Sequence, residues 1–248
     1  MRPVLILQHD STQRPGQLLA HLTQSGIDTR IVMPDHGDVV PRQASDYSGI
    51  VLLGSNRSVN EPLGWIDDEL DLVRRALAAD VPMLGHCFGG QMLARALGAR
   101  VGRSGFANIG WSRLHVTPAG MPLLKAQEVT AFNWHYETFQ IPARARRLLY
   151  GTHCLNKGFE IGPHLAFQCH FEVDESIIRD WCSQSADELS RAKGPAVQSP
   201  SLILKDLPQR VAELHRVARL VYSEWTSRLP GPAARRGAVH IASRAAVA

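Results

Sequence analysis

The chain has 248 residues, 44% of them hydrophobic, and a formal net charge of +4. This length and composition allow one substantial buried core and do not require a second domain. The stretch 230–248 contains no acidic residue but includes Arg235, Arg236 and Arg244, so the remaining body is nearly neutral and offers no basic surface for nucleic acid.

Strands and helices are expected to alternate through the first half of the chain. Apolar runs predict strands at 4–7, 29–33 and 49–53, and a further short strand from Val81. Helical spacing of apolar residues predicts helices at 17–25 and 65–79. This alternation favours an α/β fold in which a mostly parallel central sheet is flanked by helices.

The pattern changes in the second half of the chain. Between 110 and 152 we expect shorter strands, separated by Pro118, Pro122 and Pro142. A compact apolar run predicts another strand at 165–172. Two helices are expected after it, one beginning at Asp174 and one near Asp206.

Several sequence features bear on the tail and the compartment. Beyond Pro230 the sequence lacks periodicity, so we expect one domain over 1–229 and a disordered tail over 230–248. Met1 leads straight into an apolar strand rather than a signal sequence, and no apolar run approaches the length of a membrane span. The four cysteines show neither a CxxC pair nor zinc-ligand spacing. We expect a cytoplasmic protein with no membrane partner, metal or cofactor.

The segment around Cys87 has the layout of a nucleophile elbow. A short apolar strand runs into this cysteine, Gly85 and Gly89 flank it, and a helix with apolar periodicity begins directly afterward. Glycine tolerates the close approach and strained angles of such a turn. The positive end of the helix favours thiolate over thiol. These features favour an activated nucleophile at Cys87 over a buried structural cysteine.

A proton partner for that thiolate is expected on the predicted strand 165–172. Side chains alternate along a strand, so His170 and Glu172 share one face. A carboxylate behind an imidazole holds it in one tautomer and orientation. By itself His170 would be an ordinary core or surface histidine, but beside Glu172, and with Cys87 in the same chain, it completes a Cys-His-Glu arrangement.

These motifs resemble those of class I glutamine amidotransferases, of the type found as the glutaminase domain of GMP synthase and here free-standing. The elbow matches the family pattern Gly-x-Cys-x-Gly-x-Gln at Gly85, Cys87, Gly89 and Gln91. The segment 168–172 resembles Gln-x-His-Pro-Glu, with Phe171 in place of proline. The resemblance covers roughly 47–172 and implies a flavodoxin-like sheet with a small lid-side sheet.

The resemblance also implies an oxyanion hole and substrate contacts. The backbone N–H groups of Gly54 and Phe88 would hold the oxyanion, although the segment 54–56 by itself could be a plain loop. Gln91 and Asn56 would contact the substrate.

Two further segments show likeness to the family. The run 132–139 is similar to Trp-His-x-Asp-x-Phe, which implies that Trp134, His135 and Tyr136 hold the amino-acid end of glutamine. His135 could instead be a metal ligand or a second base, but no partner ligand lies at metal spacing. The run 156–159 is similar to Asn-Gln-Ala-Phe, with Lys157 and Gly158 as departures.

The implied reaction is hydrolysis of the γ-amide of glutamine. Cys87 would attack the γ-carbonyl, and His170, oriented by Glu172, would protonate the departing ammonia and then activate water. The ammonia would pass to an acceptor or to a partner synthetase chain. Two alternatives remain open. One is a stand-alone γ-glutamyl peptide hydrolase, which needs a roomier pocket on the leaving-group side, and the other is a non-catalytic binding module.

Overall fold

The computed structural model describes residues 2–230, and the prediction for the tail beyond them lies outside the described residues. The strands are β1 Val4–Leu7, β2 Thr29–Val32, β3 Gly49–Leu52, β4 Met83–His86, β5 Val101–Val116, β6 Glu128–Phe139, β7 Arg146–Tyr150, β8 Gly158–Ile161 and β9 His164–Phe167. The α-helices are α1 Gly16–Gln24, α2 Gly64–Ala78, α3 Phe88–Ala96, α4 Met121–Leu124, α5 Glu175–Gln184, α6 Ala186–Arg191, α7 Pro200–Leu204 and α8 Leu207–Ser227.

The nine strands found within the described residues form one sheet, in the order β2-β1-β3-β4-β9-β8-β7-β5-β6. Strands β2, β1, β3, β4 and β9 pair in parallel, and β8, β7, β5 and β6 continue the sheet with antiparallel pairing. The predicted α/β class, with a parallel central region flanked by helices, is confirmed. The antiparallel strands expected beside the parallel region belong to the same sheet, because β8 pairs with β9.

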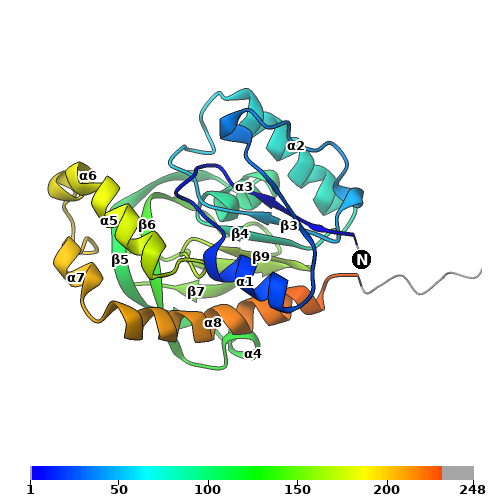
Figure 1. Cartoon of the computed structure of the whole chain (residues 1–248). Coiled ribbons are helices and arrows are strands. Elements are labelled where there is room, and N and C mark those ends of the chain that lie inside the picture. The colour runs from blue at the N-terminus through cyan, green and yellow to red at the C-terminus, as the bar shows by residue number, and fades with distance from the viewer. Residues whose placement is uncertain (1, 231–248) are drawn as a thin grey trace, which may run out of the picture.

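Helices cover both faces of this sheet (Figure 1). On one face α2 and α3 pack together, and on the other α1 packs beside α8. Val4 and Ile6 of β1 belong to the apolar cluster that includes α1 and α8, whereas Leu5 and Leu7 belong to the cluster with α2 and α3. Successive side chains of a strand point to opposite faces, so a strand covered on both sides requires the uninterrupted apolar run seen here.

The antiparallel strands are longer than the short strands expected between 110 and 152. β5 has 16 residues and β6 has 12. The prolines of this region lie in the connections, as predicted, but β5 already begins at Val101. Its register with β6 shifts between Arg103 and Asn108. That irregularity interrupts the two-residue alternation from which a long strand is inferred.

Four α-helices follow the last strand within residues 2–230, where two were expected. α5 begins at Glu175 after an N-cap at Asp174, whose carboxylate accepts from the N–H of Ile177 at 2.9 Å. α8 begins at Leu207, as predicted. The helices between them, α6 and α7, have six and five residues and are too short to show helical periodicity. Over residues 2–230 we find no helix with the length and apolar character needed to cross a membrane.

Candidate active site

Cys87 lies in a tight turn between β4 and α3. Its backbone has a φ of +51° and a ψ of −107°, a combination that residues other than glycine rarely adopt. A Cβ atom on Gly85 would lie 2.5 Å from the carbonyl carbon of Gly89, and one on Gly89 would overlap the carbonyl of Leu52. The flanking glycines are therefore required sterically. Backbone strain of this kind is concentrated at functional sites.

His170 is held by Glu172 and faces the same cavity as Cys87. Nδ1 of His170 lies 2.5 Å from Oε1 of Glu172, and both side chains are buried. Contrary to the prediction for 165–172, neither residue belongs to a strand, because β9 ends at Phe167. The N–H of His170 nevertheless donates to a carbonyl of β6 at 2.9 Å in an isolated bridge. This bridge holds the segment around His170 in an extended form beside β6. The side chains of His170 and Glu172 therefore lie on the same side of the segment, as predicted for residues two apart.

The surroundings of His170 favour its protonated form. Burial alone would lower its pKa, but the charge of Glu172, followed by the charge and hydrogen bond of Cys87, raises the pKa from 6.5 to about 10. Burial acts to raise the pKa of Glu172, whereas His170 and then His86 hold it below its ordinary value. The ring of Trp181 packs edge-on against His170 with centroids 5.0 Å apart. At neutral pH the pair is an imidazolium and a carboxylate.

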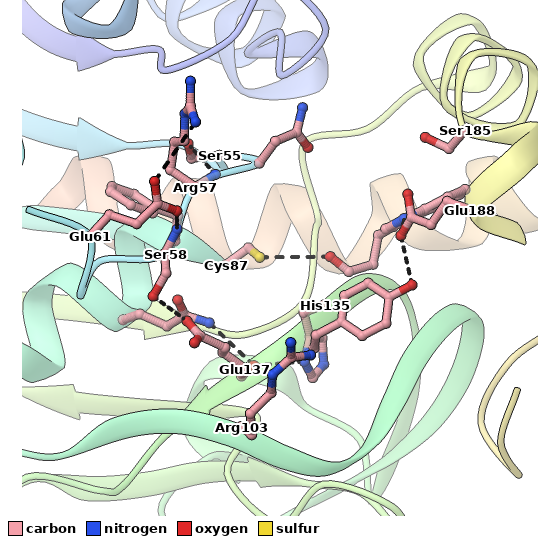
Figure 2. A pocket seen from close by; sticks show the side chains of 15 residues that line it. Ser55, Arg57, Ser58, Glu61, Cys87, Arg103, His135, Glu137, Ser185 and Glu188 are labelled. Carbon is pink, nitrogen blue, oxygen red and sulfur yellow. Dashed lines mark hydrogen bonds and ion pairs between the residues drawn. The ribbon is translucent and has the colours of Figure 1, made fainter. Parts of the chain in front are cut away.

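Two cavities open onto Cys87. The larger has a volume of about 460 Å³, and its lining includes Phe88, Gln91, Trp134, His135 and Tyr136, with the charged residues Arg57, Glu61, Arg103, Glu137 and Glu188. In Figure 2, Arg57 and Glu61 lie on one side of Cys87 and Glu188 lies on the other. The smaller cavity, about 340 Å³, is lined by Asp10, Ser11, Thr12, His170 and Trp181, among others. Of the two, the smaller cavity contains His170.

Gln91 lines the larger cavity, but its amide nitrogen already has protein partners. Nε2 donates to the carbonyl of Glu137 and to Oε1 of Gln168, both at 3.2 Å. Gln168 in turn donates from Nε2 toward Sγ of Cys87 at 3.6 Å. Gln91 therefore links α3 to β6 and to the residue that contacts the thiol.

Two aromatic residues that line the larger cavity donate hydrogen bonds to the same carboxylate. Nε1 of Trp134 and the hydroxyl of Tyr136 both donate to Oε1 of Glu188, at 3.1 and 2.8 Å. The guanidinium of Arg103 lies 5.9 Å from the centre of the Tyr136 ring. The carbonyl of Trp134 is the nearest acceptor to Sγ of Cys87 among the hydrogen bonds found, at 3.9 Å. The larger cavity is thus lined by a cation and an anion as well as by the thiol.

His135 turns toward the core, where Lys157 meets it. The ammonium of Lys157 donates to Oδ1 of Asn108 at 3.1 Å, to Oδ1 of Asn133 at 2.7 Å and to Nε2 of His135 at 2.7 Å. Three acceptors satisfy the three donors of an ammonium. Burial lowers the pKa of Lys157, while burial and then the Lys157 charge hold the pKa of His135 well below its ordinary value.

The other ring nitrogen of His135, Nδ1, lies 2.9 Å from a backbone carbonyl of β6. Both nitrogens of a neutral imidazole therefore have protein partners. This bonding accounts for His135 without a role as metal ligand or second base.

The loop after β3 and the first turn of α3 border the thiol. Phe88 is the first residue of α3 and lines the larger cavity, and the N–H of a first helical residue has no acceptor within the helix. A Cβ atom on Gly54 would lie 3.0 Å from Cε1 of His170. Asn56 donates from Nδ2 to Oδ2 of Asp10 at 3.1 Å and borders both cavities. The predicted residues that share the larger cavity with Cys87 are Asn56, Phe88, Gln91, Trp134, His135 and Tyr136, whereas Gly54 lies beside His170.

A family model described as glutamine amidotransferase class-I matches residues 12–176. The chain belongs to this family. The match includes Cys87, His170 and Glu172.

Solved and curated relatives carry the same family name. The crystal structure of a glutamine amidotransferase from Methylobacillus flagellatus superposes with a TM-score of 0.92 and 37% identity, covering 95% of this chain and 98% of that one. The glutamine amidotransferase-like protein YfeJ of Salmonella typhimurium is 26% identical over 196 residues, which are 75% of this chain and 82% of YfeJ.

Two further relatives have more specific names. A GMP synthase of Streptococcus pneumoniae is 31% identical over 153 residues, 59% of this chain and 28% of the synthase. Gamma-glutamyl peptidase 4 of Arabidopsis thaliana is 25% identical over 150 residues, 54% of this chain and 57% of the peptidase. The relatives of this chain therefore include one named as a glutamine-hydrolysing synthase and one named as a gamma-glutamyl peptidase.

Some residues around the amidotransferase site escaped the sequence analysis. Gln168 occupies the first position of the family pattern Gln-x-His-Pro-Glu. That match is the sequence signal that could have indicated its contact with Cys87. Asp10, Arg103 and Glu188 come from distant parts of the chain and carry no local motif. His86 occupies the variable position of the elbow pattern, and its partner is separated from it by many residues in sequence.

Proposed function

We propose that this amidotransferase hydrolyses the γ-amide of glutamine through a thioester on Cys87. The observation that carries the proposal is the strained elbow of Cys87, which opens onto a cavity that is also lined by His170, with Glu172 bound to the other side of the imidazole. The thiolate, balanced by the imidazolium, attacks the γ-carbonyl carbon and the carbonyl electron pair moves onto oxygen. Backbone N–H groups at Phe88 and in the loop at Gly54 stabilise that oxyanion.

His170 moves the protons of both half-reactions. The imidazolium gives its proton to the γ-nitrogen as the C–N bond breaks, so ammonia leaves and the thioester remains. The neutral imidazole then removes a proton from water, which attacks the thioester and releases glutamate and the Cys87 thiolate. Glu172 holds Nδ1 throughout and leaves Nε2 for the sulfur. The sum is glutamine plus water giving glutamate plus ammonia.

The larger cavity is suited to the amino-acid end of the substrate. Glutamine carries an α-carboxylate and an α-ammonium group, and this cavity presents both Arg103 and Glu188. Oppositely charged partners of this kind fix orientation as well as affinity. We propose that Trp134, His135 and Tyr136 hold this end through their backbone, with Gln91 and Asn56 at the sides.

The released ammonia requires a destination. We propose that it passes to an acceptor or to a partner synthetase, in keeping with the family name of the relatives. All four cysteines are free thiols, and a thiolate nucleophile works only while reduced. We therefore propose a cytoplasmic enzyme.

The direct test measures glutamate and ammonia released from glutamine by the purified chain, with Cys87→Ala as the control. The proposal expects equal amounts of both products from the wild type and none above background from the variant. Release by Cys87→Ala at the wild-type rate would overturn the proposal.

The smaller cavity favours a second candidate function. A general acid must lie on the leaving-group side of the scissile bond, and of the two cavities the one with His170 has a volume of about 340 Å³. Ammonia alone does not require that space. Hydrolysis of a γ-glutamyl peptide or amide by the same Cys87 chemistry does, and one relative is named a gamma-glutamyl peptidase.

A further inference from the structure

A buried ion pair lies beneath the loop that follows β3. Nε2 of His9, in the loop after β1, lies 2.8 Å from Oε2 of Glu69 in α2, and both side chains are fully buried. Nδ1 of His9 lies 3.1 Å from the carbonyl oxygen of Gly54. One imidazole therefore connects the ends of two neighbouring strands to the helix that covers them. The reaction proposed above assigns no role to this pair.

The pair has a rigid aromatic surrounding. The His9 ring stacks on Trp65 with centroids 5.4 Å apart, and its centroid lies 4.6 Å from that of Phe88, the residue after Cys87. Among the described residues, Oε1 of Glu69 has no hydrogen-bond partner. Removing both charges from water costs free energy that an apolar pair of similar volume would avoid. A fold that needed only packing here would not require these two residues.

The direction of the Gly54 carbonyl determines the direction of the next N–H. The described chain has no cis peptide bond, and in a trans peptide the C=O and the following N–H point in opposite directions. Because the Gly54 oxygen points to His9, the N–H of Ser55 points away from the buried pair. Ser55 borders both cavities that open onto Cys87.

We infer that His9 and Glu69 are positioning residues that hold the Gly54–Ser55 peptide with its N–H toward Cys87, so that this N–H and that of Phe88 together form the oxyanion hole. The inference rests on the proposed thioester chemistry. It assigns the second donor to the N–H that follows Gly54.

The carboxylate gives the imidazole the protonation that the contact needs. Nδ1 must carry hydrogen to donate to the Gly54 carbonyl, and an acceptor at Nε2 favours hydrogen there as well. Burial acts against the charge, but the charge and hydrogen bond of Glu69 raise the pKa of His9 above 6.5. A doubly protonated ring binds both acceptors at once.

Two matched double variants separate the contact to Gly54 from the ion pair. In His9→Asn/Glu69→Gln, the asparagine amide nitrogen falls near the place of Nδ1 and can still donate to the Gly54 carbonyl. In His9→Gln/Glu69→Gln, the longer amide reaches the place of Nε2 and misses that carbonyl. Both variants remove the ion pair, so a structural loss affects them equally.

Two reactions of Cys87 supply the readout. Alkylation by iodoacetamide develops no oxyanion, whereas acylation by glutamine does. Loss of one oxyanion donor costs about 10²–10³ in rate, so we expect acylation by His9→Gln/Glu69→Gln to fall by at least about 10-fold in kcat with little change in KM. We expect alkylation to stay within about 3-fold of the wild type. His9→Asn/Glu69→Gln should recover most of the acylation rate.

Equal acylation rates in the two double variants would overturn this inference while leaving the proposed function intact. Glutamine hydrolysis by Cys87→Ala would instead overturn the proposed function and with it the oxyanion role. A measurement on the wild type needs no folded variant. Nitrogen-15 NMR of the His9 ring should show Nδ1 protonated at neutral pH, and an unprotonated Nδ1 would contradict the inference.

Discussion

Nδ1 of His86 lies 3.5 Å from Oε2 of Glu172, so the carboxylate that holds His170 has a second buried histidine at its other oxygen. His86 is fully buried, and its Nε2 lies 3.5 Å from the hydroxyl of Tyr222 in α8. Burial is the main cause that lowers the pKa of His86 below 6.5, with Glu172 acting against it. Tyr222, His86, Glu172 and His170 thus form a row of neighbouring side chains from α8 to the smaller cavity.

Replacing His86 should weaken both the fold and turnover. His86→Phe removes the imidazole beside Oε2 of Glu172 and leaves the carbonyl of Cys169 without the ring nitrogen that lies 3.4 Å from it. A buried acceptor left without a partner costs about 1–3 kcal/mol. We expect a loss of this size in urea unfolding and a lower kcat with glutamine. Tyr222→Phe removes only a hydroxyl at 3.5 Å and is the matched control. Equal losses in the two variants would show that His86 does not support Glu172.

Glu172→Gln should lower both the pKa of His170 and turnover. The charge of Glu172 is the first of the interactions that raise this pKa to about 10 against burial, so the amide should let it fall. By analogy with acid-to-amide changes in other triads, kcat should drop by roughly 10²–10⁴. Carbon-13 NMR of labelled histidine follows the titration. A His170 resonance that titrates near pH 10 in both proteins would contradict the assignment.

The raised pKa of His170 also predicts how the stability of the protein changes with pH. A group whose pKa is raised in the folded state contributes stability that is fully present below its unfolded value, 6.5, and is lost as the pH rises toward about 10. The stability difference between the wild type and His170→Gln should therefore shrink over this range. Urea unfolding at several pH values measures it. A difference that grows with pH would contradict the ion pair.

Cys87 should be the cysteine that reacts with a glutamine-mimicking diazoketone. Burial raises the pKa of Cys169 to about 12 and that of Cys182 to about 11, so these thiols carry little thiolate at neutral pH. We expect one adduct per chain, mapped by peptide mass spectrometry to Cys87, and no adduct in Cys87→Ala. Cys182→Ala should label as the wild type does. A single adduct that maps to another cysteine in place of Cys87 would exclude Cys87 as the nucleophile.

The sequence predicted those parts of the site whose geometry is determined by residues close together in the chain or on the adjacent strand. The glycines around Cys87 are required by contacts within a few residues of the elbow or with the adjacent strand. The pair His170 and Glu172 has a spacing of two, which brings the side chains together in an extended segment even though β9 has ended. Buried strands such as Val4–Leu7 are visible because they must be apolar on both faces.

The parts that could not be predicted depend on distant contacts. Tyr222 meets His86 because α8 crosses under the sheet, and no spacing in the sequence encodes that meeting. Lys157 was recognised only as a departure from the family pattern, and its three acceptors come from β5 and β6. The length of β5 was hidden by its irregular register. Charged side chains are rarely buried, so the sequence by itself favours an exposed position for Lys157, which the structure buries.

Lys157→Met should destabilise the chain. The substitution leaves Oδ1 of Asn108, Oδ1 of Asn133 and Nε2 of His135 without their donor, and buried acceptors without partners cost roughly 2 kcal/mol in total or more. Lys157→Gln keeps an amide donor and should lose less. The exposed Lys205 offers a control, since Lys205→Met should change the free energy of unfolding by less than about 0.5 kcal/mol. Similar losses at the two lysines would contradict the buried network.

Filling the smaller cavity should distinguish the two candidate substrates. Ser11 lies on the wall of that cavity, so Ser11→Phe occupies the space beside His170 while leaving the larger cavity open. If the enzyme accepts substituted amides, the wild type should cleave γ-glutamylpropylamide at least as efficiently as glutamine. Ser11→Phe should then lower kcat/KM for the propylamide by at least about 10-fold relative to glutamine, since pocket fit at the level of single methylenes is worth that much.

Asp10 predicts the charge preference of the same leaving group. Its carboxylate lines the smaller cavity and has no cationic partner among the ion pairs found within residues 2–230. γ-Glutamylglycine would bring a second carboxylate close to it, and like charges in a partly desolvated site repel. We expect the wild type to prefer γ-glutamylpropylamide to γ-glutamylglycine, and Asp10→Asn to narrow that preference. Steady-state kinetics with both compounds measure the ratio. Two results together would contradict the alternative substrates. The wild type would have to prefer glutamine to both γ-glutamylpropylamide and γ-glutamylglycine by orders of magnitude, and Ser11→Phe would have to leave kcat/KM unchanged. Glutamine itself would then be the substrate.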